Sequence, residues 1–159
     1  IRITAKAGTL EEADQLIANT EKVIRQRLGA DIYGVDAETL DTTVLAMLAG
    51  KENALGVVEF GMQGELGRRL NVTCMQIDSV PNNLDELRKA MHAMQPRAAA
   101  VLGAVLRKEE DRQVLNLILH LPSGEVQNTR SYGGPPTMAV QWAGNNALDF
   151  LRRNLNNGI

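Results

Sequence analysis

The chain has 159 residues, of which 44% are hydrophobic and 3% aromatic, and its formal net charge is −2 at pH 7. A chain of this length can bury about 70% of its unfolded surface without disulfides, and Cys74 is its single cysteine. The slight acidic excess argues against a nucleic-acid partner. With no secretory leader and no apolar run of the ~20 residues that span a bilayer, we expect a cytoplasmic protein without membrane contact.

Residues 1–30 read as one strand followed by one helix. The alternation in residues 1–6 (IRITAK) predicts a half-buried strand, and Thr9 with Glu12 predicts a capping box at a helix start. Apolar residues then recur every three or four positions until Gly29 ends the pattern. One strand and one helix cannot enclose a core, so this stretch is expected to be the end of a domain that begins upstream.

Residues 31–159 are expected to form the second domain, joined to the first by a linker at about 29–36 (GADIYGVD). Asp36 can cap a helix that Gly50 ends. The rest of the chain alternates between strands and helices, with a turn predicted over RKEEDR, residues 107–112. The order favours parallel strands first and an antiparallel hairpin later. It predicts an α/β fold with three α/β/α layers around a mixed sheet of about five strands.

These predicted elements have the following bounds. Strands are expected at 55–60, 72–77, 98–106, 113–121 and 125–132, and helices from about 63 to 70, at 83–94 and over the last 20 residues or so.

The stretch from 57 to 70, VVEFGMQGELGRRL, is the most suggestive part of the sequence. A turn from a strand into a helix presents backbone N–H groups that can bind phosphates, and a carboxylate at the end of a buried parallel strand lies where α/β folds hold ligands. A tight turn that needs two glycines, and an ion pair of the carboxylate with an arginine, explain the same residues. The candidate ligand-binding residues are Glu59, Gly61, Met62, Gln63 and Gly64.

Gly61 to Gly64 also match the GXXG loop with which KH domains clamp nucleotide backbones. Such a loop joins two helices and profits from a basic residue, whereas here a predicted strand comes first and Met62 and Gln63 carry no charge. A nucleic-acid-binding module therefore remains only an alternative.

Other polar residues are interpreted as structural or solvated. His92 and His120 have no second histidine or cysteine at a metal-ligand spacing, and the acidic run from Glu109 to Asp111 reads as a loop. Cys74 is expected to be a small buried side chain. The arginine pairs at 68–69 and 152–153 are expected to be solvated helix ends. We expect no metal and no cofactor.

Four motifs in residues 2–48 are distinctive together: an RITA strand, an EEA helix, the connector RLGADIYGVD and the helix TLDTTVLAML. They resemble the part of CinA (competence/damage-inducible) proteins that joins a KH-like middle domain to the C-terminal deamidase domain. From residue 49 onward the likeness lies in the order of the elements. The resemblance implies that this C-terminal domain hydrolyses the amide of nicotinamide mononucleotide.

In that family the turn after the strand normally reads AESCTGG, and its serine is catalytic. Here Glu59 and Gly64 match the pattern, but Phe60 stands at the serine position, and a phenyl ring cannot attack an amide. The family's glycine-rich second turn, expected near 101–112, is missing, and the segment that carries a YSN-type motif is shortened. We therefore expect no catalytic residue, and a degenerate domain with a scaffold, dimerisation or regulatory role.

Two alternatives remain open beside this reading. Glu59 or Ser131 could serve a related nucleotide hydrolysis, with a nucleotide as ligand. Alternatively, an exposed apolar patch on the sheet edge or on the helix around Trp142 could serve as an interaction surface. The resemblance also implies a homodimer and an upstream molybdopterin-binding-like domain of the same protein.

Overall fold

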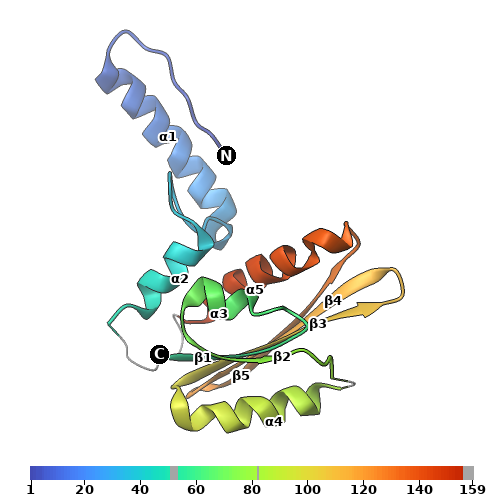
Figure 1. Cartoon of the computed structure of the whole chain (residues 1–159). Coiled ribbons are helices and arrows are strands. Elements are labelled where there is room, and N and C mark those ends of the chain that lie inside the picture. Colours follow the sequence, from blue (N-terminus) through green and yellow to red (C-terminus); the bar gives the residue numbers. More distant parts are fainter. Residues whose placement is uncertain (51–53, 82, 156–159) are drawn as a thin grey trace. The chain divides into compact units, whose positions relative to one another are not determined.

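The computed structural model describes residues 1–50, 54–81 and 83–155 and divides the chain into two compact units, residues 1–37 and 38–159 (Figure 1). Helix α1 (Leu10–Leu28) dominates the first unit and begins at the predicted capping box, where Thr9 accepts from the N–H of Glu12. It ends at Gly29, whose φ is 49°, and the short helix η1 (Gly29–Asp31) follows. No residue of α1 is buried.

The predicted strand over residues 1–6 is wrong, because none of these residues is in a strand. Alternation describes which side chains a sheet would bury, but a strand also needs a neighbour for its backbone N–H and C=O groups. Among the described residues, only the strands of the second unit pair with one another. Within the part of the chain that the structure describes, residues 1–6 therefore have no neighbouring strand with which to form backbone hydrogen bonds.

The second unit starts with α2 (Leu40–Leu48), one turn later than predicted. Thr39 caps this helix by accepting from the N–H of Thr42, while Asp36 lies outside it with a φ of 53°. The helix starts after Thr39 because this residue forms a capping box with Thr42, which Asp36 does not. The helix also ends at Leu48, two residues before the glycine predicted to stop it.

Five strands form one mixed sheet in the order β2-β1-β3-β4-β5. Strand β1 pairs in parallel with both β2 and β3, whereas β4 is antiparallel to β3 and to β5. This confirms the predicted α/β class, the parallel start and the later hairpin. The strands are β1 (Leu55–Phe60), β2 (Thr73–Ile77), β3 (Ala100–Glu109), β4 (Arg112–Leu121) and β5 (Gly124–Tyr132).

The charged turn predicted over residues 107–112 is shorter than expected. Strand β3 continues to Glu109 and β4 begins at Arg112, so only Glu110 and Asp111 connect them. Glu109 and Arg112 still pair across the ladder. Charged side chains at the end of a hairpin point into solvent, so they do not interrupt the backbone ladder.

Helices cover both faces of the sheet, as predicted (Figure 1). Helices α2, α3 (Glu65–Leu70) and α5 (Ala139–Leu155) share one core with alternate residues of β1, β3 and β4, including the predicted leucine row of β4. Helix α4 (Leu84–Met94) packs on the other face. The helices η2 (Gln95–Arg97) and η3 (Pro136–Met138) are single turns. None of the helices in the described ranges is long and apolar enough to cross a membrane.

Arg69 joins α2 to α3 and is not the solvated helix end expected from the sequence. Its guanidinium donates two hydrogen bonds to Asp41, at 2.6 and 2.8 Å, and Glu65 lies 3.5 Å away. The hydrogen bonds from Arg69 hold the pKa of Asp41 below its ordinary value. Arg152 is likewise only 12% exposed and pairs with Asp149. The helix-end interpretation missed the partner of Arg69 because Asp41 lies 28 positions away in the sequence, whereas Asp149 is only three residues from Arg152.

Candidate functional site

The turn between β1 and α3 is tight and needs its glycines. Gly61, Gln63 and Gly64 all have positive φ, at 69°, 57° and 74°. A Cβ added at Gly61 would lie 2.3 Å from the carbonyl oxygen of Leu106. A strand precedes the turn and a helix follows it, so the connection differs from the helix-to-helix loop of a KH domain.

Glu59 is fully buried, and both of its carboxylate oxygens have partners inside the protein. The backbone N–H of Leu66 donates to one oxygen and the thiol of Cys74 donates to the other, each at 3.2 Å. These partners take the place of the arginine that the sequence suggested. Glu59 thus ties the first turn of α3 to β2, and it accepts bonds within the fold that a ligand would otherwise have to supply.

Cys74 is half-buried beside this carboxylate. Burial raises the pKa of its thiol to about 12, and the hydrogen bond to Glu59 adds to the rise. The thiol therefore stays protonated at neutral pH, which suits a hydrogen-bond donor and disfavours a nucleophile.

The side chain at position 60 lies in the hydrophobic core. Phe60 is 4% exposed and packs in the cluster beneath α4, on the face of the sheet opposite Glu59. Met62 is fully buried in the cluster on the other face. Of the five candidate ligand-binding residues, only Gln63 is exposed, while Gly61 is half-buried. The turn has the outline of a ligand site, but its side chains fill the interior.

A buried amide that the sequence analysis missed lies in the same cross-sheet row as Phe60. Phe60 pairs with Val105, Val105 with Asn116, and Asn116 with Thr129. Asn116 is 5% exposed and its Oδ1 accepts from Thr129 at 3.1 Å, whereas its Nδ2 has no partner. The only signal in the sequence was one polar letter inside the apolar run QVLNLILHL.

Ser131 lies at the far end of the hairpin, on strand β5, and is exposed. It lines an open hollow of about 890 Å³ whose other walls include Glu109, Glu110 and Arg112. Neither histidine lines this hollow, so no imidazole lies there to activate the hydroxyl of the serine. In the described ranges, no three His, Cys, Asp or Glu side chains gather as metal ligands would.

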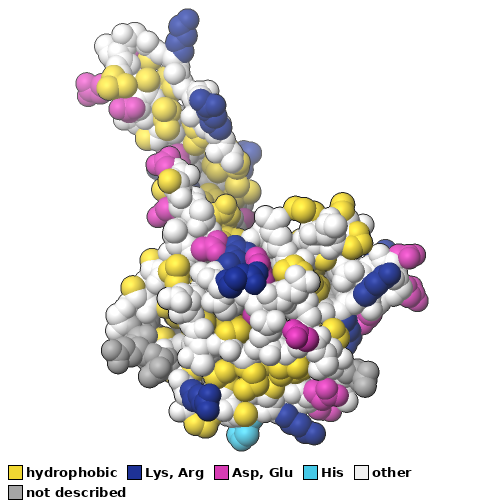
Figure 2. All heavy atoms as spheres, in the orientation of Figure 1, with side chains coloured by type: hydrophobic (Ala, Val, Ile, Leu, Met, Phe, Trp, Pro, Cys, Tyr) yellow, Lys and Arg dark blue, Asp and Glu magenta, His cyan; other side chains and the backbone are white. Residues whose placement is uncertain are grey.

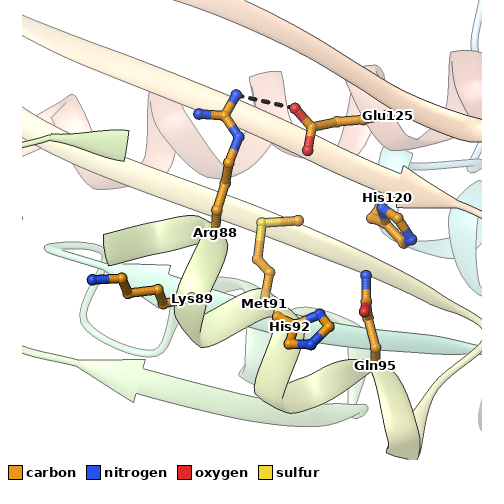
Figure 3. Close-up of a pocket in the computed structure, with 7 residues that line it drawn as sticks. All are labelled: Arg88, Lys89, Met91, His92, Gln95, His120 and Glu125. Carbon is orange, nitrogen blue, oxygen red and sulfur yellow. Dashed lines mark hydrogen bonds and ion pairs between the residues drawn. The ribbon is translucent and has the colours of Figure 1, made fainter. Parts of the chain in front are cut away.

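The structure brings together two histidines that the sequence analysis treated separately. His92 on α4 and His120 on β4 line one hollow of about 460 Å³ (Figure 3). We call it the α4 hollow. Its lining residues are Arg88, Lys89, Met91, His92, Gln95, His120 and Glu125. No residue of the β1–α3 turn contributes to it.

The surface carries both charge signs. On the face shown in Figure 2, Lys and Arg side chains are scattered among Asp and Glu side chains, without a large region of one sign. This distribution fits the net charge of −2 and differs from the basic stripe of a nucleic-acid-binding face.

Comparison with known proteins identifies the relatives of both units. The family model described as "Damage-inducible protein CinA KH domain" matches residues 1–34. A CinA-like protein of Frankia casuarinae is 28% identical over 190 residues, which cover 98% of this chain and 44% of the relative. A competence-damage inducible protein of Alkaliphilus oremlandii is 30% identical over 109 residues, or 66% of this chain and 26% of the relative. The chain thus spans less than half the length of these curated relatives.

The fold has solved counterparts. The crystal structure of the competence or damage-inducible protein from Enterobacter asburiae matches with a TM-score of 0.60 at 11% identity, and covers 74% of this chain and 99% of that chain. At this identity the match concerns the fold alone. The first 34 residues thus match a CinA family model, and the chain as a whole is similar in sequence to CinA-like proteins.

Proposed function

We propose that the second unit is a degenerate CinA C-terminal domain, which keeps the three-layer fold without nicotinamide mononucleotide deamidase activity and serves as a scaffold, dimerisation or regulatory domain. The observation that carries this proposal is the burial of Phe60, which stands at the position of the family's serine. Amide hydrolysis needs a nucleophile, or an activated water, and donors for the developing oxyanion. A core phenyl ring supplies neither.

The rest of the turn supports the same proposal. Glu59 is occupied by Leu66 and Cys74, and the side chain of Met62 fills the space on the α5 face. The alignment with the Frankia relative runs over 190 positions, more than this chain has residues, so that relative carries segments without a counterpart here. Shortening of this kind fits the loss of motifs expected from the sequence.

The direct test is ammonia release from nicotinamide mononucleotide, with a family member that carries the AESCTGG turn as the positive control. We expect the purified protein to match the no-enzyme blank. Phe60→Ser should not restore activity, because position 60 faces the core under α4. Release well above the blank by the unaltered protein would refute the proposal.

The competing hypothesis is nucleotide hydrolysis at a non-standard site, through Glu59 or the exposed Ser131. A nucleotide held at 100 times its Kd would stabilise the fold by about 2.7 kcal/mol, which a thermal shift would detect. We expect Ser131→Ala and Glu59→Gln to leave any shift with nicotinamide mononucleotide unchanged. A shift that Ser131→Ala or Glu59→Gln abolishes would favour the hydrolase instead.

Self-association is the most direct form that a scaffold role could take. Strand β5 ends the sheet, and all of its residues are exposed or half-exposed, so its outer backbone groups can pair with a second copy. Light scattering should then give about twice the monomer mass of 17.3 kDa. A monomer at every concentration would leave regulation or packing within the longer protein as the role.

A further inference from the structure

Polar side chains from α4 and from the sheet line the α4 hollow, where Arg88 points toward Glu125 while Lys89 points away from that pair (Figure 3). Arg88, His92 and Gln95 lie at positions i, i+4 and i+7 of the helical run, so they share one face along about 10 Å of its length. His120 and Glu125 face them from the sheet, where they are directly paired across β4 and β5. Met91, 3% exposed, forms part of the floor.

The charges of the hollow favour an anion. Arg88 and Lys89 are cationic, His92 and His120 add two imidazoles, and Glu125 is the single carboxylate of the lining. The other acidic group near Arg88 is Asp85, 4.0 Å away and 74% exposed. Planar guanidinium and imidazole donors suit an anion that offers several acceptor oxygens, as phosphate does.

The carboxylate of Glu125 now pairs with Arg88, at the position where such an anion would bind. One Nη of Arg88 donates to Glu125 at 3.0 Å and lies 3.5 Å from the amide oxygen of Gln127. The two partners of this ion pair are 41% and 37% exposed, and exposed pairs contribute little to stability. Arg88 can therefore exchange Glu125 for a ligand at small cost.

We propose that the α4 hollow binds a small phosphomonoester. Its phosphate lies between Arg88 and His120, in place of the Glu125 carboxylate, and its organic part extends over Met91 towards the amide of Gln95. The volume of the hollow, about 460 Å³, is in the range of small-molecule sites. The site is separate from the β1–α3 turn, and it stands whether or not that turn is catalytic.

The chain's content of two histidines makes the test simple. NMR can resolve the ring signals of both histidines, and the variants His92→Gln and His120→Gln assign each signal. Titration with glycerol 3-phosphate should shift both signals saturably, while sodium chloride at matched ionic strength should not. No saturable shift, or an equal response to chloride, would overturn the proposal.

Two variants with opposite expected effects separate binding from folding. Arg88→Gln should weaken binding about tenfold, the effect of losing one charge-assisted contact, and Glu125→Gln should strengthen it by removing the competing carboxylate. Arg107→Gln is the matched control, because Arg107 also pairs with a nearby glutamate, Glu109, outside the hollow, and it should change nothing. Equal affinity in Arg88→Gln and the parent would overturn the proposal, as would binding of single-stranded DNA without binding of the phosphomonoester.

Discussion

The β1–α3 turn and the α4 hollow contain similar polar groups, but these groups are buried and paired near the turn and partly exposed in the hollow. In and around the turn, Glu59 and Arg69 are committed to partners within the fold, and little of either is exposed. In the hollow, Arg88 and Glu125 make one partly exposed ion pair beside two imidazoles. The difference teaches that a turn with the outline of a ligand site can be filled by contacts within the fold, while another surface keeps groups that a ligand could use.

The largest effect should come from position 60, where a phenyl ring lies in the core. Phe60→Ala removes a buried ring from the core under α4, and we expect it to lower the free energy of unfolding by about 3 to 5 kcal/mol. Val126→Ala, at a side chain that is 37% exposed, should change it by about 0.5 kcal/mol or less. Urea denaturation measures both. A loss below about 1 kcal/mol for Phe60→Ala would mean that the ring borders a cavity rather than the core.

The two carboxylates provide the next comparison. Glu59→Ala leaves the N–H of Leu66 and the thiol of Cys74 without an acceptor, so the free energy of unfolding should fall by about 2 to 3 kcal/mol. Glu125→Ala breaks only an exposed ion pair and should cost about 0.5 kcal/mol. Equal losses in the same denaturation experiment would remove the distinction between the turn and the hollow.

The smallest difference is expected between the ion pairs Arg69–Asp41 and Arg88–Asp85. It should appear in how the free energy of unfolding depends on pH. Because Arg69 lowers the pKa of Asp41, this pair stabilises the fold above the unfolded pKa of Asp, about 3.9, and that stability is lost as the pH falls through the folded value. After solvent screening we expect about 1 kcal/mol. Asp41→Asn should flatten the acid limb of stability against pH, whereas Asp85→Asn, at a highly exposed carboxylate, should leave it unchanged. An unchanged limb in Asp41→Asn would contradict this account.

The sequence predicted well what depends on neighbours along the chain. The leucines at alternate positions of β4 identified the face that packs in the core with α5, and the glycines of residues 61–64 identified a tight turn. Both patterns reflect local rules, the two-residue period of a strand and the positive φ that glycine tolerates.

What the sequence did not predict depends on partners far along the chain. The strand expected at residues 1–6 failed for want of a neighbour, and Arg69 found Asp41 across 28 positions. His92 and His120 line one hollow only because α4 packs against the sheet that contains β4. Periodicity carries no information about such pairings. Neither the internal hydrogen bonds of Glu59 nor the α4 hollow could therefore be predicted from the sequence.

The two-residue connections of β3, β4 and β5 bear on how this domain reaches its native state. Residues 110–111 and 122–123 are all that separate these strands, so closing their loops sacrifices little chain entropy. The parallel partners β1 and β3 must instead meet across α3, β2 and α4, which is slower. Strands β3, β4 and β5 should consequently form the folding nucleus. Their amides should gain protection first in pulsed hydrogen exchange during refolding.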